Sequence, residues 1–282
     1  MIEKILLASS GTGQSEEMLK ALMEIPSIQR STVNVLHVVP PQASADAMTQ
    51  KWEDGGKTLA VAIQALGLDP NRTTAMLREG DPKDVVCRVA EEIDADLIIM
   101  GSRGLKRLQS ILENSVSQYV FQLASRPMLL VRDDIYVRKI NRIMVAMDKS
   151  DSAQASLKLA LAFLRDIKGG QLVLVHANPD LKVKRDEVEV DPNQDPVLLP
   201  AIAEAKKLGI NYRCVAPVGK PGARICQIAD ELNVDLLVLG SPERRPSIAK
   251  ALPDLDRLLG QSLSDYVRVY ANCPVMLVRT AA

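Results

Sequence analysis

The most constraining feature of the sequence is an internal duplication. Five segments of the first half return in the same order in the second half: "KILLAS" as "RIMVAM", "VLHVV" as "LVHAN", "GDP" as "GKP", "DADLIIMGS" as "NVDLLVLGS", and "SVSQYVFQLASRPMLLVR" as "SLSDYVRVYANCPVMLVR". Matches that keep their order along a chain indicate a duplicated domain. We therefore expect two similar domains in tandem.

The spacing of the repeats predicts where the domains lie. The offset between equivalent residues is 139 from His37 to His176 and 147 near the end of the copies, so the second copy is 147 − 139 = 8 residues longer. At 282 residues the chain is long enough for two hydrophobic cores. We expect one domain at 1–133 and another at 139–282, joined by a short linker.

The pattern of apolar residues predicts the fold class. Short apolar runs such as "ILLA", "LIIM" and "MLLV" alternate with stretches of helical period such as "PKDVVCRVAEEI". This alternation predicts βαβ units, and strands that are apolar at nearly every position are typical of parallel sheets covered on both faces. We expect an α/β protein with two Rossmann-like, doubly wound open parallel sheets of five strands each.

The composition limits the partners. The 35 Lys and Arg residues balance 35 Asp and Glu residues, so the net charge favours neither nucleic acid nor an anionic membrane. The four cysteines are far apart and contain no C-x-x-C pair, which fits a reducing cytosol better than a zinc or redox site. No apolar run approaches the roughly 20 residues that span a bilayer. We expect a cytoplasmic protein whose partners include neither nucleic acid nor membrane.

The carboxyl ends of the strands are the expected binding region, because ligands of doubly wound sheets bind there. In the first copy a strand ends at Met100 and Gly101, Gly104 follows, and a helix is expected from about Ser115. Glycines let the backbone approach a ligand, and the amides and hydroxyls at a helix start, including that of Ser117, can bind phosphate. Alternatively, the glycines are turn residues and Ser115 only caps the helix.

These segments resemble a known family. "MGSRG", nine further residues and "NSVS" are similar to the universal stress protein signature G-x2-G-x9-G-[ST], and "VAMDKSDSA" resembles the first strand and acidic turn of that family. The similarity extends over both halves, so the chain is identified as a tandem member. The resemblance implies an adenine nucleotide as ligand, ATP or AMP, with Mg²⁺ accompanying ATP. The family also contains members that do not bind ATP.

The resemblance implies a phosphate side, an adenine contact and a nucleoside contact in the first copy. The phosphate side consists of Gly101, Gly104, Asn114, Ser115 and Val116. The adenine contact is Val38, and the nucleoside contact is Ser10. Asn114 replaces the family glycine and tolerates a positive φ better than most residues. Ser10 replaces an aspartate, and a neutral hydroxyl is expected to weaken the contact with the ribose by about 1 kcal/mol.

The second copy departs from the family pattern differently. The resemblance implies that Asp148 supplies the aspartate, Ala177 the adenine contact, and Gly240 and Ser262 parts of the phosphate loop. Glu243 stands at the second glycine position, where its charge would repel a phosphate. We expect the first copy to be the better nucleotide site.

The sequence favours binding over catalysis. The two histidines, His37 and His176, lie at equivalent points of the second strands, where a structural role is expected. The sequence contains no P-loop G-x4-G-K-[ST] and no evident cluster of metal ligands.

Three functions stay open. The glycine and serine pattern favours a nucleotide-binding regulator of the stress response. The alternatives are a ligand-free scaffold that recruits an unknown protein partner, and an ATP-using enzyme, whose least demanding form is slow hydrolysis. The resemblance also implies self-association through the terminal strands "MLLVR" and "VMLVR", which pair across two domains. In one chain this gives an internal pseudo-dimer, which can then dimerise further.

Overall fold

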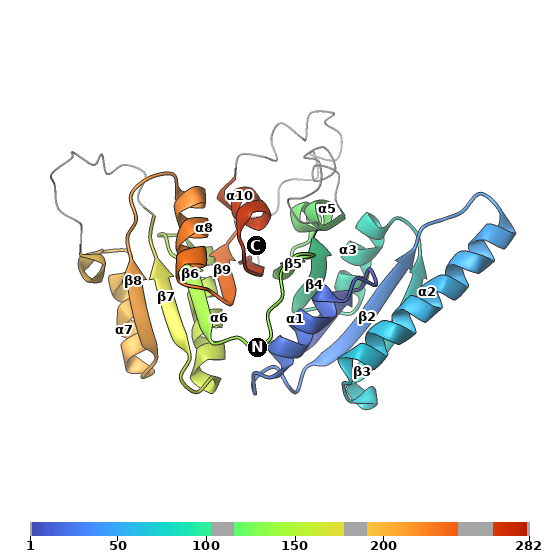
Figure 1. The fold of residues 1–282 in the computed structure, drawn as a ribbon, viewed down its shortest axis with the longest axis horizontal. Coiled ribbons are helices and arrows are strands. Elements are labelled where there is room, and N and C mark those ends of the chain that lie inside the picture. Colours follow the sequence, from blue (N-terminus) through green and yellow to red (C-terminus); the bar gives the residue numbers. More distant parts are fainter. Residues whose placement is uncertain (1, 103–115, 178–190, 242–261, 281–282) are drawn as a thin grey trace. The chain divides into compact units, whose positions relative to one another are not determined.

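The chain folds into two compact units, Met1–Arg138 and Lys139–Ala282. Each unit combines one parallel sheet with helices (Figure 1). The α/β class and the two Rossmann-like halves expected from the sequence are thus confirmed. This computed structural model describes residues 2–102, 116–177, 191–241 and 262–280.

The first unit contains a five-stranded parallel sheet in the order β3-β2-β1-β4-β5. Its strands are β1 (Lys4–Ala8), β2 (Thr32–Val39), β3 (Thr73–Glu79), β4 (Leu97–Ser102) and β5 (Met128–Arg132). Its described helices are α1 (Gln14–Met23), α2 (Ala45–Leu66), α3 (Pro82–Glu92) and α5 (Val116–Leu123). Helix α1 contacts α2, and α3 contacts α5, so the helices cover the sheet in two pairs.

The second unit repeats this topology with the order β8-β7-β6-β9-β10. Its strands are β6 (Arg142–Ala146), β7 (Gln171–Val175), β8 (Asn211–Val215), β9 (Leu236–Gly240) and β10 (Val275–Val278). Its described helices are α6 (Asp151–Asp166), α7 (Leu199–Lys207), α8 (Pro221–Glu231) and α10 (Leu263–Tyr270).

Local sequence explains these elements. In β1 the consecutive residues Ile5, Leu6 and Leu7 are all fully buried, which requires cover on both faces of the sheet. Helix α3 begins with Pro82, which fits the first turn, and the Asp81 side chain accepts a hydrogen bond from a backbone N–H of that turn. The GDP motif, residues 80–82, therefore leads into the start of a helix.

The topology places a candidate site at one edge of each sheet. In the first unit β1 and β4 are neighbours, yet the chain continues from β1 to β2 on one side and from β4 to β5 on the other. The connections diverge beyond the carboxyl ends of β1 and β4, and such a point is where doubly wound sheets bind ligands. Strands β6 and β9 form the same arrangement in the second unit.

No helix within the described residues is both long enough and apolar enough to cross a membrane.

Candidate functional site

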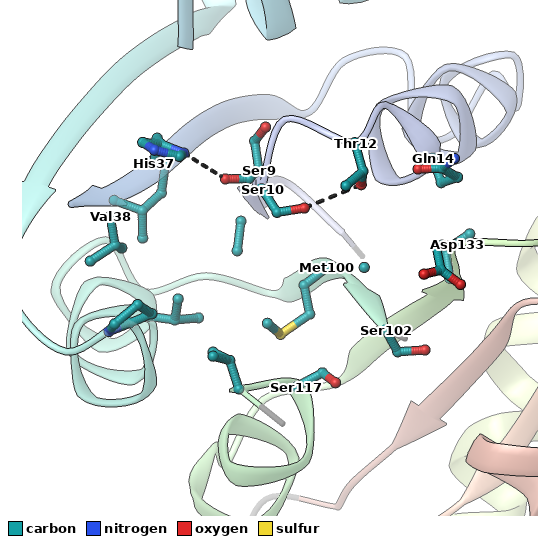
Figure 2. A pocket seen from close by; sticks show the side chains of 17 residues that line it. Ser9, Ser10, Thr12, Gln14, His37, Val38, Met100, Ser102, Ser117 and Asp133 are labelled. Atoms are coloured by element: carbon teal, nitrogen blue, oxygen red, sulfur yellow. Dashed lines mark hydrogen bonds between the residues drawn. The ribbon is translucent and has the colours of Figure 1, made fainter. Parts of the chain in front are cut away.

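A cavity of about 400 Å³ opens at the carboxyl ends of the strands of the first unit (Figure 2). Its volume lies in the range of sites for small molecules. Six of the residues expected from the sequence line it: Ser10, Val38, Met100, Gly101, Val116 and Ser117. They come from four elements or their ends, so the fold gathers residues that are far apart in the chain. Gly104, Asn114 and Ser115 lie outside the described residues.

The packing of the described residues does not require a glycine at position 101. A Cβ atom placed on it would have the Val131 carbonyl oxygen, at 4.0 Å, as its nearest neighbour. A side chain at this position would therefore enter the cavity without colliding with the described protein. The absence of a side chain instead lets a ligand come close to the backbone at the end of β4.

The start of helix α5 forms another part of the cavity wall. Val116 and Ser117, its first two residues, line the cavity, and Ser117 is 3% exposed. Backbone N–H groups in the first turn of a helix lack partners within the helix, and the helix dipole adds a partial positive charge. This part of the wall is suited to an anion such as a phosphate group.

The loop between β1 and α1 contributes hydroxyl groups. The Ser10 and Thr12 hydroxyl oxygens are 3.2 Å apart, and both side chains line the cavity. Gly11 and Gly13 have φ values of 79° and 89°, which an L residue rarely adopts. The two glycines thus permit the backbone path that presents the hydroxyls. The Ser9 hydroxyl turns away from this pair and donates to the buried Glu16 carboxylate.

His37 lies at the β2 end of the cavity, and the sequence analysis did not assign it to the site. Its Nδ1 is 2.9 Å from the Ser9 carbonyl oxygen. Because a carbonyl oxygen only accepts, Nδ1 carries the proton and Nε2 of the neutral ring is an acceptor. The ring fits beneath α2 because Gly55 has no side chain: a Cβ there would be 3.2 Å from His37 Cδ2. The position of His37 inside a strand could be predicted from the sequence, but its contact with Ser9 and its place in the cavity could not.

Asp133, Ser102 and Gln14 form the opposite end of the cavity (Figure 2). The Asp133 backbone N–H donates to the Ser102 carbonyl oxygen at 3.0 Å, which holds the residue after β5 against the end of β4. The Gln14 amide nitrogen donates to the Tyr136 hydroxyl at 3.4 Å. Asp133, the last residue of the expected first domain, was not expected at the site, because it is the pairing of β5 with β4 that brings it there.

The equivalent residues of the second unit have different surroundings. A Cβ on Gly240 would lie 2.7 Å from both the Ala153 backbone nitrogen and the Ser152 hydroxyl oxygen. Helix α6 thus occupies the space that stays open above Gly101, and its close approach to β9 accounts for the glycine. The Asp148 carboxylate accepts hydrogen bonds from the backbone N–H and the hydroxyl of Ser150.

Of the remaining residues expected at the site of the second unit, the structure describes Ser262 and Ala177. The Ser262 hydroxyl caps α10 by accepting a hydrogen bond from the Asp265 backbone N–H at 3.1 Å. Ala177, two residues after β7, is 9% exposed. Glu243 lies outside the described residues. His176 differs from His37, because its Nδ1 is 2.8 Å from the buried Asp195 carboxylate instead of a backbone carbonyl.

Comparison with known proteins agrees with this architecture. The family model described as the universal stress protein family matches residues 1–132 and again residues 139–279. Universal stress protein YxiE of Bacillus subtilis is 26% identical over 148 residues, which cover 47% of this chain and all of that protein. A universal stress protein of Thermus aquaticus, named for the QAH/OAS sulfhydrylase 3' region, is 30% identical over 139 residues, with the same coverage.

A solved structure is similar over nearly the whole chain. The crystal structure of a universal stress protein from Archaeoglobus fulgidus has a TM-score of 0.73 at 20% identity and covers 99% of this chain and 96% of its own. This likeness concerns the fold alone. Together with the two family matches along the sequence, it accounts for the repeated topology, and the chain belongs to the universal stress protein family with two family domains in tandem.

Proposed function

We propose that the protein is a cytosolic stress-response regulator that binds an adenine nucleotide, ATP or AMP, in the cavity of its first unit. One observation carries the proposal: Gly101 leaves open space over β4, and the start of α5 faces the same cavity. A glycine that no described atom crowds, beside the start of a helix, suits a phosphate group. Val38 and His37 border the other end, where the adenine would lie.

We also propose that the protein binds without dedicated catalysis. The His37 Nδ1 atom contacts the Ser9 carbonyl oxygen at 2.9 Å, which fixes the orientation of the ring, and we assign the ring a structural role. The hydroxyls of Ser10, Thr12 and Ser102 can donate to or accept from a ligand but have no assigned role in bond cleavage. Product analysis after long incubation with ATP and Mg²⁺ tests this part, and turnover on the scale of about 1 per second would contradict it.

Gly101→Val tests the site. The valine side chain would fill the space above β4, so nucleotide affinity should fall by at least about tenfold, or roughly 1.4 kcal/mol. Because the nearest described atom to the new Cβ would be 4.0 Å away, folding should be little affected. Isothermal titration calorimetry with AMP and ATP measures the affinity, and thermal unfolding checks the fold.

Gly56→Val is the matched control. Gly56 is half-buried in the middle of α2, has no described atom within 4 Å of an added Cβ, and does not line the cavity. This variant should bind nucleotide as the unchanged protein does. Equal affinities of the Gly101→Val variant and the control would overturn the proposed site.

Self-association through the terminal strands β5 and β10 is part of the proposal, as the family resemblance implies. Sedimentation at several protein concentrations tests it.

A further inference from the structure

The loop that presents the Ser10 and Thr12 hydroxyls to the cavity contains two glycines. Gly11 and Gly13 both have positive φ values, and glycine gives the backbone more conformational freedom than any other residue. The residues of the loop therefore do little by themselves to fix its shape. A loop of this kind presents its hydroxyls in one arrangement only when hydrogen bonds to neighbouring elements hold it there.

Ser9, which connects β1 to this loop, is held by four hydrogen bonds. Its backbone N–H donates to the Leu36 carbonyl oxygen at 2.9 Å, and its own carbonyl oxygen is 2.9 Å from His37 Nδ1, a contact drawn in Figure 2. Its hydroxyl group accepts from the Gly11 backbone N–H at 3.3 Å and donates to the Glu16 carboxylate. The hydrogen bonds through the Ser9 hydroxyl thus tie the loop to helix α1.

Glu16 is the buried end of this chain of hydrogen bonds. Its side chain belongs to a residue that is only 2% exposed, and its second carboxylate oxygen accepts a hydrogen bond from the Ser15 hydroxyl at 2.9 Å. Burial of a carboxylate is costly, and hydrogen bonds from hydroxyl groups offset part of that cost. Because bonds to a carboxylate are stronger than bonds between neutral groups, Glu16 holds Ser9 more firmly than a neutral side chain would. Glu16 does not line the cavity itself.

The second unit lacks this pair of residues. Met147 and Gln154 stand at the positions of Ser9 and Glu16, so the hydroxyl and the carboxylate are both replaced. There the loop contains its own acid, since the Asp148 carboxylate accepts from the backbone N–H and the hydroxyl of Ser150. The carboxylate that holds the loop therefore lies within the helix in the first unit and within the loop in the second.

We propose that Glu16 is a positioning residue for the ribose: through Ser9 it fixes the loop that presents the Ser10 and Thr12 hydroxyls. The two hydroxyl oxygens are 3.2 Å apart, so together they can contact the neighbouring 2′ and 3′ hydroxyls of one ribose. This inference rests on the proposed nucleotide site. It adds a residue that acts on the ligand without touching it.

Ser9→Ala removes the hydroxyl that links Glu16 to the loop, and 2′,3′-dideoxyadenosine 5′-monophosphate lacks both ribose hydroxyls. Titration calorimetry with AMP and with this analogue gives two affinities for each protein. We expect the unchanged protein to bind AMP about tenfold more tightly than the analogue. In the variant the AMP affinity should fall about fivefold, while the affinity for the analogue changes by less than about twofold.

Glu16→Gln is the second variant, because it keeps the size of the side chain and removes the charge from the acceptor. The AMP affinity should fall about threefold and the affinity for the analogue should again stay within about twofold. The same titrations with ATP and its 2′,3′-dideoxy form extend the comparison to the triphosphate.

Ser15→Ala is the matched control. Ser15 is also buried and donates to the same carboxylate, but it does not line the cavity. This variant should keep both affinities within about twofold of those of the unchanged protein. Thermal unfolding measures the stability of each variant, so a loss of ribose recognition is distinguished from a loss of folding.

The outcomes separate the inference from the function on which it rests. Losses of equal size for AMP and the analogue in Ser9→Ala would indicate a general distortion of the cavity, and the inference would be wrong. It would also be wrong if Glu16→Gln left the AMP affinity unchanged, if Ser15→Ala had the same effect as Ser9→Ala, or if the unchanged protein bound both ligands equally. In each of these cases the nucleotide site remains. If the unchanged protein binds neither AMP nor ATP, the proposed function and the inference both fail.

Discussion

Ser10 lies in the loop between β1 and α1, where the family usually has an aspartate, and its hydroxyl is 3.2 Å from that of Thr12. Both hydroxyls line the cavity between the adenine end and Gly101. A hydroxyl can contact ribose, but a carboxylate would accept its hydroxyl protons through charge-assisted bonds. In the proposed nucleotide site, the residue at position 10 would therefore set the strength of the contact with the ribose.

Ser10→Asp is expected to tighten AMP binding by about fivefold, because a charge-assisted bond is stronger by about 1 kcal/mol. Calorimetric titration with AMP measures the effect. Gln42→Glu adds the same charge at an exposed position outside the cavity and should not change the affinity. A loss of affinity in the Ser10→Asp variant alone would show that the ribose does not lie beside this loop.

The cysteines illustrate the effect of burial on single residues. Burial raises the pKa of the Cys273 thiol to about 12 and that of the Cys214 thiol to about 11. The thiolate is the reactive form, so both residues should be poor nucleophiles at neutral pH.

We predict that iodoacetamide leaves Cys273 and Cys214 largely unmodified in the folded protein at pH 8. Reaction should become faster as the pH rises toward 11 and 12, because the thiolate fraction then increases. Peptide mass spectrometry measures the modification at each site, and the protein unfolded in guanidinium chloride is the control. Rapid labelling of Cys273 at pH 8 in the folded protein would be incompatible with its burial.

At the scale of elements, the two units differ in how closely a helix approaches the neighbouring strand. Helix α6 approaches β9 so closely that an added Cβ on Gly240 would be 2.7 Å from the Ala153 nitrogen. No described atom is nearer than 4.0 Å to the corresponding position on Gly101 at the end of β4. The same topology is therefore packed closely in one unit and left open in the other.

A pair of alanine substitutions tests this difference. Gly240→Ala should reduce the free energy of unfolding by about 1–3 kcal/mol, because the methyl group would overlap the backbone of α6. Gly101→Ala should change it by less than about 0.5 kcal/mol, since the methyl group has room. Urea unfolding followed by circular dichroism gives both values. Equal losses of stability in the two variants would contradict the described packing.

At the scale of the whole molecule, the duplication has produced two domains that differ, within the described residues, in the space at the carboxyl ends of their strands. The equivalent of Gly101 is crowded in the second unit, and the Asp148 carboxylate is engaged by Ser150. A duplicated fold can keep its core while one copy loses a binding surface, since the core and the loops at the strand ends depend on different residues.

We therefore predict a stoichiometry of about one nucleotide per chain. Calorimetric titration at a protein concentration well above Kd measures it directly. Gly101→Val should then remove essentially all binding, with no residual site in the second unit. Two equivalent sites per chain would contradict the closure of the second unit over Gly240.

Most of the fold could be predicted from the sequence. The consecutive apolar residues of β1 required a sheet covered on both faces, and the repeats predicted the two units. These features are local or periodic, so they can be read along the chain. Part of the candidate site followed from them, since the carboxyl end of β4 had to lie beside that of β1.

The rest of the site depends on contacts between distant segments. His37 and Asp133 gave no local signal, because one joins the cavity through the Ser9 carbonyl and the other through pairing of β5 with β4. The sequence by itself determined the duplicated α/β fold and a glycine at the end of β4. Only the tertiary structure decided that no described atom crowds Gly101 while helix α6 covers Gly240, since the approach of a helix to a strand depends on packing over the whole unit.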